Sequence, residues 1–302
     1  SFGSSCSLLQ AIQIFRSHYA LLDSHLHLAK TFSLMGGFWR SRLLPLKHAL
    51  HAPHSRMLVT ATSPKPMKRF YQITSTEQQG ELWRVLLDNK AVKTPRGTFL
   101  ELPTQALAQA VAKEWDAQGE TLKPKEMPLT TVGCTAVDLI RPEKAECIQR
   151  LLPFLAMDTL CFEDDNELLA ELQAQEWDPV RIWFESRFDV KLGIARGLGA
   201  PAHPDGTQGT VEAELNLRDE WELSALEIAT STAKSLVVAT ALLDRADIEA
   251  KDALRLALLE EHFQIERWGL VEGEHDVAHN EALMWLEACR HFGKHGRGPS
   301  VE

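Results

Sequence analysis

Two histidines are the most suggestive chemical pattern in the chain. His275 and His279 are four positions apart, so a helix would place both imidazoles on one face, with nearby glutamates as possible further metal ligands. The zinc-protease pattern needs a glutamate directly after the first histidine, and this chain has Asp276 there, one methylene shorter. A metalloenzyme using His275 and His279 is therefore kept as an alternative function, and it is the weaker hypothesis.

Other enzyme-like patterns are incomplete. Ser231 and Lys234 have the S-x-x-K spacing in which a lysine can activate a serine, but the S-D-N and K-T-G elements of that enzyme class are missing. Gly197-Leu198-Gly199 resembles the start of a dinucleotide loop, but Pro201 follows it and the third glycine is missing. A G-x-x-x-x-G-K-[ST] phosphate loop is also missing from the sequence. We predict no enzymatic activity, no cofactor and no metal.

Charge is divided unevenly along the 302 residues. The formal net charge is −10, but residues 1–67 contain seven basic residues and one acid, while residues 68–302 contain 25 basic and 41 acidic residues. An acidic chain is poorly suited to binding phosphate backbones, and the longest apolar stretch, residues 236–243, is far below the roughly 18 residues that span a bilayer. We expect no nucleic-acid partner, no membrane insertion and a monomer when free.

The basic segment 1–67 has the composition of a targeting sequence. It is rich in serine and histidine and poor in acid, and residues 8–16 could form a short amphipathic helix. A disordered basic tail is the alternative. The five cysteines are odd in number and form no C-x-x-C pair, which favours a reducing compartment. We predict a transit peptide over 1–67.

The segment 68–128 is predicted to form a small sheet with a helical cover. Strand-like runs occupy residues 69–72, 82–87, 91–94 and 98–102, with turn residues between them. Thr104 can cap a helix over 105–118, in which Leu107, Val111 and Trp115 follow one another at i+4 spacing. The sequence therefore predicts an antiparallel meander that rests on this apolar stripe.

The remainder, 129–293, is predicted to be all helical. Gly193 to Gly209 interrupts it with a loop rich in glycine and proline, and Gly293 is a typical residue for a helix end, followed by a tail over 294–302. The fold class is therefore α+β, with a β-rich N-terminal domain and a helical C-terminal domain. The expected helices cover residues 130–140, 142–156, 167–188, 212–235, 235–243, 247–270 and 278–292.

A carboxylate interrupts the apolar face of the predicted helix 247–270. Leu254, Leu258, Glu261, Ile265 and Trp268 fall on one stripe at 100° per residue. A buried unpaired carboxylate costs several kcal/mol, so Glu261 must meet a cation or hydrogen-bond donor, shift its pKa, or face a partner. An internal ion pair and an anchor at a protein interface are the two alternatives. We expect this helix to be central to the helical domain.

Tryptophans supply a second signal, because this residue is common both in cores and at interfaces. Trp115 and Trp268 lie at helical spacing with other apolar residues and are predicted to be core. Trp177 or Trp221 could instead be exposed anchors.

Several blocks together resemble the ATP12 family, assembly chaperones of the mitochondrial F1 ATP synthase with relatives in alpha-proteobacteria. The most specific block is E-E-x-x-Q-x-x-x-W-G-x-x-E over residues 260–272. The resemblance covers about residues 68–292, with departures at 161–164 and 193–209. The other blocks are Glu114-Trp115-Asp116 with Gln118, Met127-Pro128-Leu129-Thr130-Thr131, Trp177-Asp178-Pro179 with Trp183, and Ser235-Leu236.

The resemblance implies a non-enzymatic chaperone that binds the unassembled F1 α subunit in the mitochondrial matrix. Glu114 and Trp115 are assigned to the fold. The predicted partner-binding residues are Glu261, Glu260, Gln264, Glu272 and Trp268.

Overall fold

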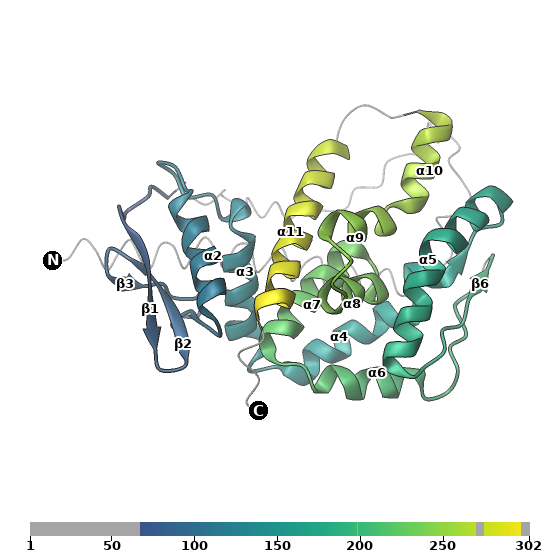
Figure 1. The fold of residues 1–302 in the computed structure, drawn as a ribbon, viewed down its shortest axis with the longest axis horizontal. Helices are drawn as coiled ribbons and strands as arrows, with labels where there is room; N and C mark the ends of the chain where they lie inside the picture. The colour runs from purple at the N-terminus through teal and green to yellow at the C-terminus, as the bar shows by residue number, and fades with distance from the viewer. Residues whose placement is uncertain (1–66, 198, 270–274, 297–302) are drawn as a thin grey trace, which may run out of the picture.

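The computed structural model describes residues 67–197, 199–269 and 275–296. The predicted transit peptide, apart from Met67, and the predicted binding residue Glu272 lie outside the described residues. A four-stranded antiparallel sheet with helix α2 forms one end of the molecule, and helices α4 to α11 form the rest (Figure 1). The predicted α+β fold class is confirmed.

The sheet is built around strand β2 (Leu82–Leu87), whose predicted bounds are confirmed. It pairs along its full length with β1 (Thr74–Gln79), while β3 (Lys90–Ala91) and β4 (Glu101–Leu102) share its other edge. The predicted first strand at 69–72 is wrong, because β1 begins only at Thr74. The Asp88 carboxylate instead accepts hydrogen bonds from the backbone N–H groups of Gln72 and Ile73, at 3.0 and 2.9 Å from Oδ1.

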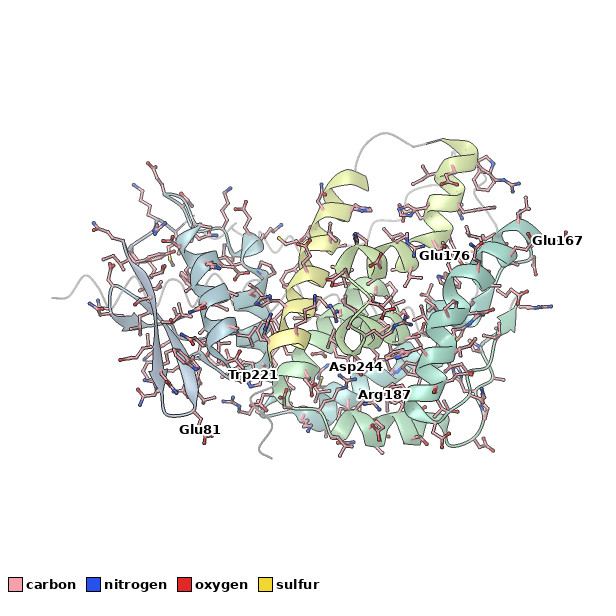
Figure 2. The ribbon with its side chains drawn as sticks, in the orientation of Figure 1. Glu81, Glu167, Glu176, Arg187, Trp221 and Asp244 are labelled. Carbon is pink, nitrogen blue, oxygen red and sulfur yellow. The ribbon has the colours of Figure 1, made fainter. Side chains whose placement is uncertain are left out.

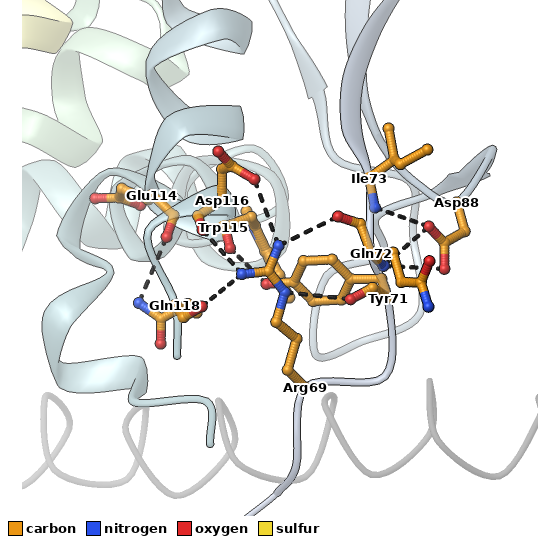
Figure 3. Close-up of polar contacts among 9 residues, drawn as sticks. All are labelled: Arg69, Tyr71, Gln72, Ile73, Asp88, Glu114, Trp115, Asp116 and Gln118. Atoms are coloured by element: carbon orange, nitrogen blue, oxygen red, sulfur yellow. Dashed lines mark hydrogen bonds and ion pairs between the residues drawn. The ribbon is translucent and has the colours of Figure 1, made fainter. Parts of the chain in front are cut away.

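Helix α2 (Gln105–Asp116) covers one face of the sheet. The side chain of Thr104 caps it by accepting a hydrogen bond from the Leu107 N–H, and the stripe that ends in Trp115 is buried as predicted. The Tyr71 hydroxyl donates to the Trp115 carbonyl at 2.6 Å, and the Arg69 guanidinium donates to the Asp116 carbonyl at 2.9 Å (Figure 3). The chain entering the sheet is therefore fastened to the end of this helix.

The predicted helix 130–140 is in fact two segments, α3 (Pro128–Thr135) and the π-helical turn η2 (Ala136–Ile140), preceded by the 3₁₀ turn η1 (Pro124–Glu126). The carboxylate of Glu114 in α2 accepts hydrogen bonds from the Leu129 and Thr130 N–H groups at 2.6 and 2.8 Å. Burial raises the pKa of Glu114 to about 7, although these hydrogen bonds act to lower it. Glu114 thus holds α3 against α2, in agreement with its assignment to the fold.

Helix α3 joins the sheet to the helical part. A Cβ atom on Gly133 would lie 3.2 Å from Leu100 Cδ1 and 3.6 Å from Phe292 Cζ, so the sheet and the last helix both approach α3 closely at this glycine. The buried apolar side chains form one continuous core from the sheet to the helices. The domain boundary at 128/129 stays a prediction.

Helices α7 (Glu220–Ala233), α8 (Leu236–Asp244) and α11 (His275–His295) form the centre of the helical part. The first eight residues of α8 are all buried. The predicted helix 212–235 is divided, because Asp219 caps α7 in a capping box. Around this centre lie α4 (Lys144–Ala156), the turn η3 (Thr159–Cys161), α5 (Glu167–Phe188) and α6 (Thr207–Asn216), with a parallel strand pair of β5 (Phe162–Glu163) and β6 (Ala195–Arg196).

The prediction that the last helix ends at Gly293 is wrong, since α11 continues to His295, inside the predicted tail. A Cβ atom on Gly293 would lie 3.1 Å from the Leu243 Cα and carbonyl oxygen. The glycine therefore permits close packing of α11 on α8 and does not end the helix.

Candidate partner-binding surface

The predicted helix 247–270 consists of α9 (Ala250–Ala257) and α10 (Leu259–Trp268), which meet at Leu258 with φ −104° and ψ 17°. The break ends the predicted stripe: Leu254 in α9 is buried, but Ile265 in α10 is only half-buried and Trp268 is 74% exposed. The predictions of one central helix and of a core Trp268 are therefore wrong. Helix α10 lies at the edge of the molecule beside α5 (Figure 1).

Helix α10 is held mainly at its first turn. Leu259 is the one buried residue among its ten. The buried Gln173 of α5 donates from Nε2 to Glu260 Oε1 at 2.8 Å, and its own Oε1 accepts from the Asp164 N–H at 2.9 Å. Just before the break in the sequence, the Trp177 indole donates to the Leu256 carbonyl at 3.0 Å. These contacts fix the start of α10 and leave its later turns extending from α5.

The structure places four of the five predicted binding residues on this one helix. Glu260 and Glu261 are half-buried in its first turn, where carboxylates are favoured by the helix dipole, and Gln264 and Trp268 are exposed further along. Predicted residue Glu272 lies outside the described residues. The helix therefore offers acids at its start and an exposed indole at its end.

Sequence reasoning missed Gln173, which orients Glu260. Its signal was available, because Gln173 is a polar residue on the stripe of α5 that also contains Leu169, Trp177 and Val180. A glutamine at a core position needs partners for its amide, and one of these partners is Glu260.

The alternative anchors are not on the surface. Trp177 is fully buried, and Trp221 is buried with its ring stacked on Phe292 at a centroid distance of 6.4 Å. Both tryptophans belong to the core, so the prediction that one of them is an exposed anchor is wrong. Their apolar rings pack between helices of the core.

The candidate enzyme residues are not assembled into a reactive site. Ser231 Oγ donates to the Ile228 carbonyl at 3.0 Å, and Lys234 ends α7 in a left-handed conformation. The centroid of the His279 ring lies 6.1 Å from that of the His262 ring in α10. Within the described ranges, which do not include the His275 side chain, no group of three or more His, Cys, Asp or Glu side chains could hold a metal ion. Nor does any described helix have the length and apolarity of a membrane span.

Known proteins are similar to this chain in sequence and in fold. The model of a family described as ATP12 chaperone protein matches residues 68–185. A Schizosaccharomyces pombe protein named Protein atp12, mitochondrial, is 31% identical over 235 residues, which cover 72% of this chain and 80% of the relative. The Saccharomyces cerevisiae Protein ATP12, mitochondrial, is 25% identical over 258 residues, with coverage of 70% and 79%. The crystal structure of Atp12 from Paracoccus denitrificans superposes with a TM-score of 0.70 at 30% identity, over 76% of this chain and 98% of that chain.

These similarities define a class of non-enzymatic chaperones. The chain belongs to the ATP12 chaperone family. The predicted absence of enzymatic activity is confirmed by this membership, and the metalloenzyme alternative is not supported. Both curated relatives are named as mitochondrial proteins, in agreement with the predicted location, and family membership makes this protein an ATP synthase assembly chaperone.

Proposed function

We propose that the protein binds the unassembled α subunit of F1 through helix α10 and keeps it competent for assembly in the mitochondrial matrix. The observation that carries this proposal is Trp268, a large apolar side chain that is 74% exposed at the end of α10. Exposed tryptophans are rare on isolated proteins and common as anchors at interfaces. Family membership supplies the assembly role.

The chemistry of α10 suits a temporary complex. An unassembled subunit exposes apolar surface that aggregates unless it is covered. Trp268 can bury apolar area on the client, while Glu260 and Glu261 speed encounter with a positively charged surface and set its register. One small helix limits the total area, so the client can still leave for its assembled neighbours.

Helix α10 can present these groups because its base is rigid. Gln173 donates to Glu260, and the buried Trp177 donates to the Leu256 carbonyl near the end of α9. The sheet, α2 and α3 share the continuous core with the helices. We propose that the module 68–128 supports the fold, and that the client contacts the helical part 129–293.

A charge reversal at Glu261 tests the site. The full chain is used to capture the F1 α subunit from matrix extract, as wild type, as Glu261→Lys and as Glu81→Lys. Glu81 is an exposed glutamate in the turn between β1 and β2, at the opposite end of the molecule (Figure 2), and it controls for the change in net charge.

We expect wild type and Glu81→Lys to recover similar amounts of α, and Glu261→Lys to recover about a tenth or less. A lysine at this position would face a positively charged client surface, and repulsion between like charges costs about 1.4 kcal/mol or more. If the wild type recovers no α, the proposed function is wrong. If Glu261→Lys recovers as much α as Glu81→Lys, only the assignment of the site is wrong.

A further inference from the structure

The outer face of helix α5 is a second exposed surface with an unusual composition. Residues at i+3 and i+4 spacing along its five turns share one stripe that contains no charged side chain. In this stripe Ile182 is 63% exposed and Leu168 is 54% exposed. The full stripe is Leu168, Leu172, Gln175, Pro179, Ile182 and Ser186.

The opposite face of α5 already accounts for its packing. Trp177, Val180 and Phe184 are buried there in the core, whereas Leu172 is the one apolar side chain of the outer stripe that packs partly against it. Exposed helical positions normally carry charged or polar residues, and a quarter of this chain is charged. An uncharged stripe of this length is the pattern expected where another helix packs.

One end of the stripe is strongly acidic. Asp165, Glu167 and Glu171 are exposed at the start of α5, and no cation among the described residues forms an ion pair with them. The nearby Arg196 and Arg255 are taken by Glu163 and Glu176. Figure 2 shows Glu167 at the outer end of the helix and Glu176 further along it. A segment lying on the stripe would therefore meet three uncompensated carboxylates at this end.

The stripe belongs to the helix that also holds the start of α10, although it lies on another face of that helix. Helix α10 contacts α5 through the hydrogen bond between Gln173 and Glu260, and the Arg255 side chain of α9 contacts Glu176 of α5 at 2.5 Å. The acids at the start of α10 and those at the start of α5 thus lie on adjoining helices.

We propose that the outer face of α5 binds an amphipathic helical segment of the client, with a row of apolar side chains over the stripe and lysines or arginines at the end that meets Asp165, Glu167 and Glu171. The inference rests on the proposed function and extends it, because it defines the chemistry that the client must present. Apolar burial on the stripe supplies affinity, and the acidic end fixes the direction of the bound helix.

A matched pair of isoleucines tests the stripe. Binding of the full chain to purified F1 α subunit is measured for wild type, Ile182→Glu and Ile73→Glu. Ile73 lies directly before β1 and is 67% exposed, so the two substitutions make the same change at almost the same exposure. We expect Ile182→Glu to raise the Kd about tenfold or more, because it removes apolar burial and adds an acid, and Ile73→Glu to change it less than twofold.

The acidic end has its own test. Glu167→Lys combined with Glu171→Lys is expected to raise the Kd at least fivefold at low salt and less at high salt, since screening weakens contacts between exposed charges. Equal binding by wild type, Ile182→Glu and the double variant, while Glu261→Lys still binds weakly, overturns the α5 inference and leaves the proposed function intact. If the wild type itself does not bind the α subunit, both are overturned.

Discussion

Trp115→Arg tests whether the join between the sheet and helix α2 maintains the fold. Trp115 is 2% exposed, and its ring meets the Tyr71 ring edge-on at a centroid distance of 5.7 Å. The Tyr71 hydroxyl is bonded to the Trp115 carbonyl, so the segment that leads into β1 depends on the end of α2 (Figure 3). The substitution replaces the buried ring by a guanidinium in this join.

The cost follows from the area that is lost. A buried tryptophan removes about 150–250 Å² from water, and at about 25 cal/mol per Å² this contributes about 4–6 kcal/mol, an upper value because the unfolded chain is itself partly compact. Removal of a core tryptophan typically costs about 3–5 kcal/mol, and an unpaired buried charge adds several more. Domains have about 5–15 kcal/mol of stability in total. We therefore expect Trp115→Arg to lose most of its stability.

The assay is urea and thermal unfolding followed by far-ultraviolet circular dichroism, with Trp268→Arg as the matched control. Trp268 is 74% exposed, so the same substitution there should change the free energy of unfolding by about 0.5 kcal/mol or less, although it should weaken client binding. If Trp115→Arg unfolds at the same urea concentration as the control, the assignment of Trp115 to the core is refuted.

Three further predictions concern stability. Burial raises the pKa of Glu114 from 4.5 to about 7, so protonation of Glu114 favours the folded state. The stability of the wild type relative to Glu114→Gln should therefore be highest below pH 4.5 and fall as the pH rises through about 7. A constant difference between the two proteins across pH 4–8 would contradict this. Asp158→Ala should cost about 3 kcal/mol in urea unfolding, because the buried Asp158 carboxylate accepts from Ser235 Oγ at 2.7 Å and from the Val237 N–H at 3.0 Å; a loss below about 1 kcal/mol would argue against this. Gly293→Ala should destabilise the protein by about 1–3 kcal/mol, because the new methyl group would clash with α8. Gly209→Ala, in open space within α6, should stabilise the protein by about 0.5–1 kcal/mol. Equal effects of the two substitutions would refute the packing argument.

Local signals predicted the elements that depend on local physics. Strand β2 and helix α5 have the predicted bounds, because Trp83, Val85 and Leu87 share one side of β2 and Asn166 caps α5 through the Leu169 N–H. The stripe ending in Trp115 was predicted for the same reason. Each of these elements carries its own start signal and its own apolar period.

The errors arose where tertiary contacts decide. No glycine or proline marks the break at Leu258, so periodicity alone continued the helix through it. A stripe shows which face of a helix is apolar but not whether another element covers it, and for this reason Trp268 was assigned to the core. Gly293 has the residue type of a helix end, but a glycine is needed there because Leu243 of α8, a helix distant in the sequence, approaches it closely. These are contacts between segments far apart in the sequence.

Asp88 shows the same limit within the sheet. Its carboxylate binds the backbone N–H groups of Gln72 and Ile73, which moves the first strand five residues beyond its predicted start. The hydrogen bonds to these two amides lower the pKa of Asp88. A side chain that bonds to a distant backbone leaves no periodic pattern in the sequence.

The binding equilibrium with the isolated F1 subunits tests the central claim most directly. The full chain is titrated with purified α subunit and, separately, with purified β subunit, and complexes are measured by sedimentation velocity. The account predicts a one-to-one complex with α that Glu261→Lys weakens about tenfold, and no complex with β under the same conditions. No complex with α, or equal binding of α and β, would contradict it.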